Sequence, residues 1–136
     1  LLDQDLGGLV EVHRKRRADA TLLLHRRSGS NSFVELDAAG RIRAFAERPG
    51  PEERRALGEA WVNSGVQVLG ASLLAELPHA PSDLPRDVYA ARCAELRMFG
   101  VPLDGYRCAI DSPERYAEAE RALASGLCRP RGWTRR

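Results

Sequence analysis

The sequence has few cysteines, and they do not follow a recognisable pairing pattern. Cys93, Cys108 and Cys128 are an odd number, and no C-x-x-C spacing occurs among the 136 residues. This pattern argues against a disulfide framework and against a zinc site. It indicates a protein of a reducing, cytoplasmic compartment.

Long apolar runs and an excess of charge of one sign are also missing. No apolar run approaches the roughly 18 residues that a membrane span needs, and no signal peptide is recognisable. The formal net charge is +2, and the arginines are mixed with Asp and Glu. We therefore expect neither a membrane nor a nucleic acid as partner. The basic run 14–17 is interpreted as a solvated helix end rather than as a patch for phosphates or a partner protein.

The chain is long enough for one compact domain, since 43% of its 136 residues are hydrophobic. Helical and extended patterns alternate along it, with one inserted hairpin, which predicts an α/β layer with a mixed sheet. The expected elements are a helix after Asp5, strands at 20–24, 33–36, 42–45 and 62–69, a short helix at 72–77 capped by Ser72, a helix at 86–96, strands at 98–101 and 106–110, and a helix after Ser112.

Some of these elements carry more specific expectations. The continuous apolar run 20–24 fits a strand buried on both faces, and the turn 37–40 begins with Asp and ends with Gly. The charged segment 50–60 reads as a connector. The last helix is expected to bury a stripe of Tyr116, Ala119, Ala122 and Leu123.

Two short segments contain side chains that can bind hydroxyl and phosphate groups. Glu47 can accept two charge-assisted hydrogen bonds, and Arg48 beside it can grip a phosphate with two bonds. Asn63 can donate to and accept from a hydroxyl, and Gly65 lets the backbone approach a ligand closely. The alternatives are a surface ion pair at a strand end for the first pair, and a strand that begins with a bend for the second.

In this order, the segments resemble the second half of a sugar-1-phosphate nucleotidyltransferase, in particular the guanylyltransferases that act on heptose or mannose 1-phosphate. The resemblance covers residues 1 to about 123, and the ordered set is more specific than any single motif. The motifs are E-L-D-A-A-G-R-I at 35–42, E-R-P at 47–49, N-S-G-V at 63–66, P-L-D-G-Y at 102–106 and S-P-E-R-Y at 112–116.

The resemblance implies a Rossmann-like mixed sheet of the nucleotidyltransferase (GT-A-like) type and a reaction. A sugar 1-phosphate attacks the α-phosphorus of a nucleoside triphosphate, here GTP, and pyrophosphate leaves. Glu47 matches the family's glutamate for sugar hydroxyls, and Arg48 stands where the family usually has lysine. Asn63 and Gly65 match the family's Asn-x-Gly, and Ser32 stands where the family often has glycine near the sugar.

The chain departs from the family at the Mg²⁺ site. The family pattern is Asp-x-Gly-x-Pro, and alignment on Pro113 puts Ala109 at the aspartate position and Asp111 at the glycine position. Residues two apart on a strand share a face, so Asp111 is a candidate Mg²⁺ ligand from a shifted place. The alternative is that Asp111 only caps the last helix alongside Ser112.

The motifs of the family's nucleotide site do not occur in the sequence: a Gly-rich loop with an Arg, a Pro-Lys-Pro segment and an Asn-Gly-Asp. We therefore expect residues 1–125 to be the C-terminal, sugar-phosphate-binding part of a nucleotidyltransferase domain that lacks its N-terminal nucleotide-binding half, with 126–136 as a disordered basic tail. By itself this piece is expected to be inactive. A non-catalytic sugar-phosphate sensor, a partner subunit and a plain interaction domain are the alternatives. No histidine is expected to be catalytic, since His13, His25 and His79 have no partner at a ligand spacing.

Overall fold

The computed structural model describes residues 1–28, 30–52, 55, 59–78 and 80–129. The chain divides into two compact units, one of residues 7–102 and the other of residues 1–6 with 103–136. Part of the predicted connector 50–60 and most of the predicted tail lie outside the described residues. Among the described residues, no helix combines the length and the apolar character that crossing a bilayer requires.

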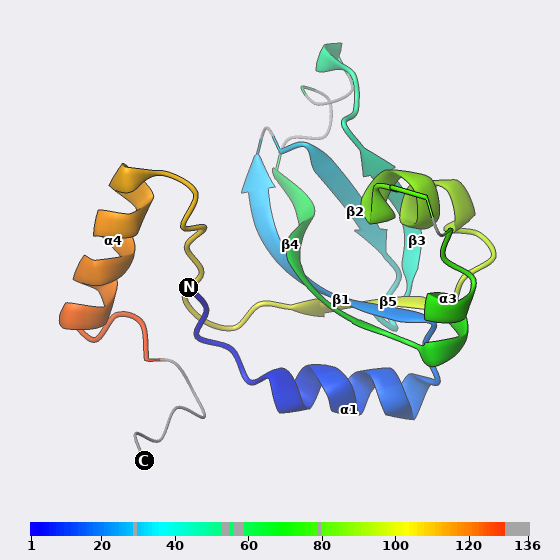
Figure 1. Ribbon diagram of the computed structural model, residues 1–136, viewed down its shortest axis with the longest axis horizontal. Helices are drawn as coiled ribbons and strands as arrows, with labels where there is room; N and C mark the ends of the chain where they lie inside the picture. Colours follow the sequence, from blue (N-terminus) through cyan, green and yellow to red (C-terminus); the bar gives the residue numbers. More distant parts are fainter. Residues whose placement is uncertain (29, 53–54, 56–58, 79, 130–136) are drawn as a thin grey trace. The chain divides into compact units, whose positions relative to one another are not determined.

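The larger unit is built on a mixed sheet, as the sequence predicted, and the described residues form five strands of it (Figure 1). β1 pairs antiparallel with β4 on one side and parallel with β5 on the other. Residues 20–24 of β1 are fully buried, which confirms the strand covered on both faces. The strands are β1 (Ala20–Ser28), β2 (Ser32–Leu36), β3 (Ile42–Glu47), β4 (Glu59–Leu69) and β5 (Met98–Pro102), in the order β3-β2-β4-β1-β5.

Helices lie on both sides of this sheet. Helix α1 (Leu6–Arg16) buries Leu9, and its His13 Nδ1 lies 3.1 Å from Thr21 Oγ1 of β1. On the other side, α3 (Ala71–Ala75) and the π-helix η1 (Leu84–Ala90) cover the main core. This core includes the side chains of Leu22, Leu24, Phe45, Val88, Tyr89 and Met98.

The β2–β3 hairpin has the turn that the sequence predicted. The Asp37 carboxylate accepts hydrogen bonds from the backbone N–H groups of Ala39 and Arg41, each at 2.9 Å, and Gly40 has φ +78°. The turn also reaches the opposite edge of the sheet, because Gly100 of β5 donates its N–H to the Gly40 carbonyl at 2.9 Å. The hairpin tip thereby covers part of the β5 edge, which would otherwise present unpaired backbone groups.

Two helix boundaries differ from the sequence prediction. Ser72 does not cap α3; the cap is Gly70, which donates its N–H to the Asp19 carbonyl, and the helix ends at Ala75 rather than at residue 77. The helix predicted at 86–96 begins earlier, as η1, with Asp83 as its cap through a 3.1 Å bond from the Arg86 N–H. In both places a tertiary or side-chain hydrogen bond sets the start of the helix.

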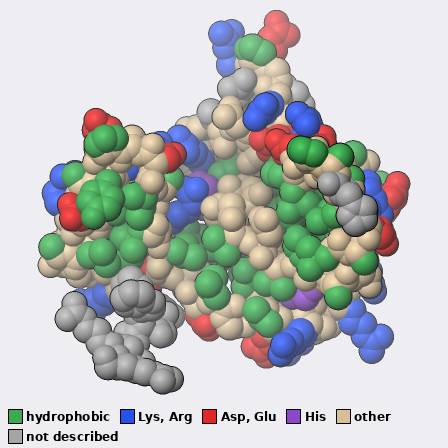
Figure 2. Space-filling view, viewed as in Figure 1, with side chains coloured by type: hydrophobic (Ala, Val, Ile, Leu, Met, Phe, Trp, Pro, Cys, Tyr) green, Lys and Arg blue, Asp and Glu red, His purple; other side chains and the backbone are tan. Residues whose placement is uncertain are grey.

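The smaller unit contains helix α4 (Pro113–Ala124), capped as predicted by Ser112, whose Oγ accepts from the Arg115 N–H. The predicted strand at 106–110 is wrong: only Arg107 forms a bridge, to Leu2, because the paired N-terminal segment is short. The predicted stripe on α4 is half right. Ala119 and Ala122 are buried, but Tyr116 and Leu123 are 55% and 46% exposed, and Figure 2 shows hydrophobic side chains on the surface of α4.

Candidate functional site

The Asn63–Gly65 segment lies at an irregularity in the middle of β4. The register between β1 and β4 passes from Leu22↔Gln67 to Leu24↔Asn63, so three β4 residues lie opposite a single β1 residue. Gly65 has φ +80° and donates its N–H to Asn63 Oδ1 at 3.0 Å. Such bulges bend a strand and change the direction of its side chains. Gly65 therefore fixes the Asn63 amide, and the bend lies within the strand rather than at its beginning.

The Glu47–Arg48 pair lies at the end of β3. Glu47 is opposite Ser32 of β2, and Arg48 follows in the left-handed region with φ 54°. Its N–H donates to the Asn31 carbonyl, in the loop that precedes β2. A positive φ is uncommon for any residue with a side chain, and a residue before proline normally prefers extended backbone. The exposed Arg48 side chain is thus presented from a sharply turned backbone.

The structure brings Glu47 and Asn63 to the same region of the sheet. Ser32 connects them, since it is paired with Glu47 and its Oγ accepts the Asn63 N–H at 3.2 Å. β2 is the strand between β3 and β4, so the two Cα atoms are roughly 10 Å apart, which is two strand spacings. Ser32, which stands where the family often has glycine, therefore links the two segments.

Glu47 and Asn63 also share one side of the sheet. Glu47 is two residues from Phe45, whose ring contacts Tyr89 of η1 with centroids 5.5 Å apart. Asn63 is opposite Leu24, a member of the core that η1 covers. Because alternate residues of a strand, and directly opposed residues of two strands, point to the same side, both side chains lie on the η1 side.

The charge environment of Glu47 is unfavourable for its carboxylate. Its pKa is raised, first by burial and then by the carboxylate of Asp83, the cap of η1; the Arg48 cation opposes the shift. An acid in this setting gains most from a ligand that donates hydrogen bonds or brings positive charge. The Asp83 contribution could not be read from the sequence, because it depends on where η1 begins.

Asn63 retains donor capacity. Its Oδ1 accepts from Gly65, and its Nδ2 makes no hydrogen bond within the part of the chain that the structure describes. Beside it, the buried Ser64 places Oγ 3.0 Å from Nδ1 of His25. The arrangement presents an amide donor and a carboxylate acceptor on one surface, and these are complementary to the hydroxyls of a sugar.

Asp111 has a different setting from the one predicted. The residues before it do not form a strand, so the argument that Ala109 and Asp111 share a strand face does not hold. Arg115 Nη1 lies 2.9 and 3.0 Å from the two Asp111 carboxylate oxygens. Ser112 caps α4, and Asp111 forms an exposed ion pair with Arg115 in the first turn.

The described residues do not by themselves suit Mg²⁺. No group of three His, Cys, Asp or Glu side chains is gathered among the residues that the structure describes. The Asp111 carboxylate is already neutralised by Arg115, whereas Mg²⁺ sites use carboxylate and phosphate oxygens around an octahedron. The role of Asp111 as a metal ligand stays a prediction.

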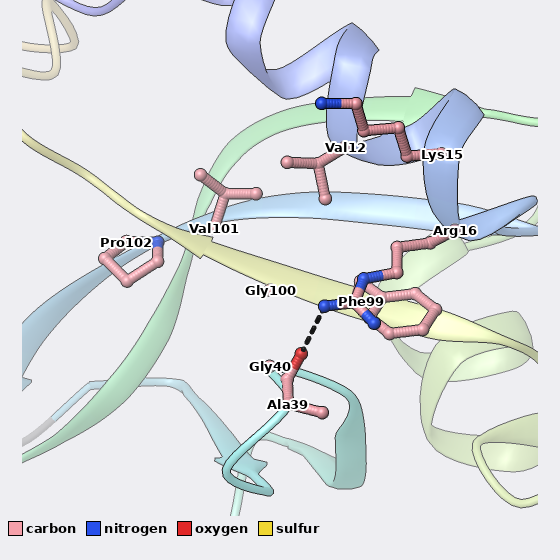
Figure 3. Close-up of a pocket in the computed structure, with 9 residues that line it drawn as sticks. All are labelled: Val12, Lys15, Arg16, Ala39, Gly40, Phe99, Gly100, Val101 and Pro102. Carbon is pink, nitrogen blue, oxygen red and sulfur yellow. Dashed lines mark hydrogen bonds between the residues drawn. The ribbon is translucent and has the colours of Figure 1, made fainter.

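A cavity of about 340 Å³ lies elsewhere on the larger unit, between α1, β5 and the hairpin turn (Figure 3). Arg16 lies over the Phe99 ring with its Cζ 5.4 Å from the centroid, and the Gly100–Gly40 hydrogen bond crosses the cavity wall (Figure 3). None of the residues predicted to bind substrate lines it.

Comparison with known proteins identifies relatives of one chemical class. No family model matches the chain. Three probable mannose-1-phosphate guanylyltransferases of Oryza sativa subsp. japonica, numbered 3, 2 and 1, are 21%, 20% and 20% identical over 122 residues. These alignments cover 88% of this chain and 32% of each relative. The chain therefore spans about a third of the length of these relatives.

Solved structures of nucleotidyltransferases have a similar fold. HddC from Yersinia pseudotuberculosis superimposes with a TM-score of 0.62 at 15% identity, over 88% of this chain and 49% of that one. CMP:2-keto-3-deoxy-manno-octonic acid synthetase complexed with CTP gives a TM-score of 0.62 at 18% identity, over 90% and 56% of the two chains. The predicted resemblance and the mixed α/β fold of the nucleotidyltransferase type are confirmed, and the match is a partial one.

Proposed function

We propose that this chain is the sugar-phosphate-binding part of an enzyme that transfers a nucleotidyl group to a sugar 1-phosphate. The observation that carries the proposal is the convergence of Glu47 and Asn63 on the η1 side of the sheet, joined through Ser32. Its similarity to mannose-1-phosphate guanylyltransferases supports GTP and mannose 1-phosphate as substrates. A structure of HddC with GMP-PN also matches, with a TM-score of 0.61.

The predicted residues would contact different parts of the ligand. The Glu47 carboxylate accepts hydrogen bonds from sugar hydroxyls, and the Asn63 Nδ2 donates to a neighbouring oxygen. Arg48 neutralises the phosphate from the end of β3. Gly65 acts indirectly, since its N–H holds Asn63 Oδ1 and its missing side chain leaves space on the bulge.

The reaction requires little more of this chain than binding and orientation. A phosphate oxygen of the sugar 1-phosphate attacks the α-phosphorus of the triphosphate, the bond to the β-phosphate oxygen breaks, and pyrophosphate leaves. Holding the attacking phosphate in line and neutralising its charge lowers the barrier. Mg²⁺ would supply further charge neutralisation at the phosphates. The proposal also places the protein in a reducing, cytoplasmic compartment, because its three cysteines show no pairing pattern.

The direct test is a calorimetric titration of the chain with mannose 1-phosphate. We expect binding to the wild type and a loss of about tenfold or more in the Asn63→Ala and Glu47→Gln variants. Asn63→Ala removes the amide donor, and Glu47→Gln removes the charge and one of the two acceptor oxygens. Equal binding by all three proteins, or no binding by the wild type, would refute the proposal.

A second candidate function is a non-catalytic binder of the same ligand. It is favoured by Ala109, which stands at the aspartate position of the family pattern, and by the ion pair that occupies Asp111. A pyrophosphate-release assay separates the two functions, with this chain joined to the nucleotide-binding half that the resemblance implies. Turnover with GTP and mannose 1-phosphate above background would eliminate the binder, and binding without turnover would favour it.

A further inference from the structure

A stacked cation lies next to Asn63 on the same side of the sheet. The Arg26 guanidinium of β1 has its Cζ 4.2 Å from the centroid of the Trp61 ring of β4. The β1–β4 register pairs Arg26 with Trp61 and Leu24 with Asn63. Arg26 is therefore two residues along β1 from Leu24, which lies opposite Asn63. Because alternate residues of a strand share a face, the side chains of both pairs point to the η1 side.

The stack gives Arg26 a defined position although its side chain is exposed. Trp61 packs against the core that contains Val34 and Leu24, so the ring is a firm support. A guanidinium over an indole ring is attracted by the ring's negative face. Because fewer rotamers remain to be fixed when a ligand binds, an arginine held in this way loses less entropy on binding than a free one.

The position of Arg26 complements that of the other predicted residues. Asn63 is on β4, with β2 and β3 on one side of it and β1 on the other. Glu47 and Arg48 approach from the β3 direction, and Arg26 approaches from β1. A phosphate dianion is bound well by more than one donor, and the planar guanidinium matches two of its oxygens.

We propose that Arg26, positioned by Trp61, binds the phosphate of the ligand that Glu47 and Asn63 hold by its sugar. This inference rests on the proposed function, because it assigns a further residue to the same site. Trp61 contacts Arg26 and not the phosphate, so it is a positioning residue. The competing account is that Arg26 only shields the indole ring from water.

Arg27 provides a matched control. It is the next residue, it is also exposed, and it pairs with Ala60, so its side chain points to the opposite side of the sheet. Arg26→Gln and Arg27→Gln remove the same charge at adjacent positions. Any effect of net charge alone would appear in both variants.

The experiment is calorimetric titration of the full chain and these variants with mannose 1-phosphate and with mannose. We expect Arg26→Gln to weaken binding of mannose 1-phosphate by about tenfold or more, with mannose binding unchanged and Arg27→Gln equal to wild type. Arg26→Lys should recover part of the loss, since the charge returns without the two-bond geometry.

Two results would overturn the role of Arg26 alone: wild-type affinity for mannose 1-phosphate in Arg26→Gln, or an equal loss for mannose and mannose 1-phosphate. Failure of the wild type to bind mannose 1-phosphate at all would overturn the proposed function, and this inference with it. Thermal unfolding of each variant shows that the loss does not come from unfolding.

Discussion

At the scale of single residues, Glu47 combines the chemistry of the site with a cost to the fold. Its pKa is raised by burial and by Asp83, so the folded state favours the protonated acid more than the unfolded state does. Stability contributed by this group is present below the unfolded pKa and is lost as the pH rises through the folded one. A side chain kept in such a setting is consistent with a role in binding.

The Glu47→Gln variant tests this directly. At neutral pH we expect a higher unfolding temperature than wild type, because the neutral amide avoids the unfavourable ionisation. The difference should vanish as the pH falls below the ordinary pKa of a glutamate, where the wild-type carboxyl is protonated in both states. Thermal unfolding followed across this pH range measures it, and a variant that is less stable than wild type at neutral pH would contradict the account.

Arg48 stores backbone strain at the same place. Its φ of 54° suits glycine and disfavours a residue with a Cβ. Arg48→Gly should raise the free energy of unfolding by up to about 1 kcal/mol and weaken mannose 1-phosphate binding. Arg48→Lys keeps the Cβ and the charge, so its stability should match wild type. Denaturant unfolding of the three proteins tests this, and a destabilised glycine variant would show that the side chain matters more than the backbone.

At the scale of elements, the bulge in β4 is the feature that places Asn63. Gly65 has φ +80°, and no heavy atom of the described residues, apart from its chain neighbours, lies within 4 Å of the position that a Cβ would take. Substitution is therefore limited by backbone conformation and not by space. The conformation, the Asn63 hydrogen bond and the register change belong to one local structure.

We expect Gly65→Ala to destabilise the fold by roughly 1–2 kcal/mol, the cost of a left-handed residue with a Cβ, and to weaken mannose 1-phosphate binding. Gly65→Asn should lose less stability, because asparagine tolerates the left-handed region better. Denaturant unfolding compares the two. Equal losses in both variants would mean that strain in the bulge is not the cause.

The hairpin turn depends on the ionised Asp37. Hydrogen bonds from the Arg41 and Ala39 backbone and from Arg43 lower its pKa, with the Arg41 N–H as the largest cause. Its contribution to stability is thus present above the unfolded pKa and is lost as the pH falls through the folded one. Asp37→Ala should lower the unfolding temperature at neutral pH, and by less in acid.

Asp37→Asn is the control for this turn, because it keeps the oxygen that accepts from the two backbone N–H groups. It loses the charge and, with it, the second oxygen that accepts from Arg43. It should lie between wild type and Asp37→Ala at neutral pH. An alanine variant whose loss is the same in acid and at neutral pH would show that the carboxylate charge is not what stabilises the turn.

At the scale of the whole molecule, local signals predicted the sheet well and the start of some elements poorly. The buried strand at 20–24 and the turn at 37–40, which begins with Asp and ends with Gly, are determined by local sequence. Both predictions are confirmed. Ser72 had the right chemistry for a cap, but Gly70 begins α3 because its N–H bonds to Asp19. Such a tertiary contact is not visible in a local pattern.

In the candidate site, too, local motifs were predictable and contacts that depend on the tertiary structure were not. Glu47 and Asn63 were predicted from ordered motifs, and the structure places them on one side of the sheet. The stack of Arg26 on Trp61 was not predicted, because their pairing depends on a register that changes at the bulge. The strand expected at 106–110 failed because its bonding partner is the short segment around Leu2.

The central claim is that a sugar phosphate binds on the η1 side of the sheet, around Glu47 and Asn63. The most direct measurement is a titration of isotope-labelled protein with mannose 1-phosphate, followed through its backbone amide resonances. We predict shifts concentrated at residues 31–32, 47–48 and 61–65. An absence of shifts, or shifts confined to the cavity around Arg16, Gly40 and Phe99, would contradict the account.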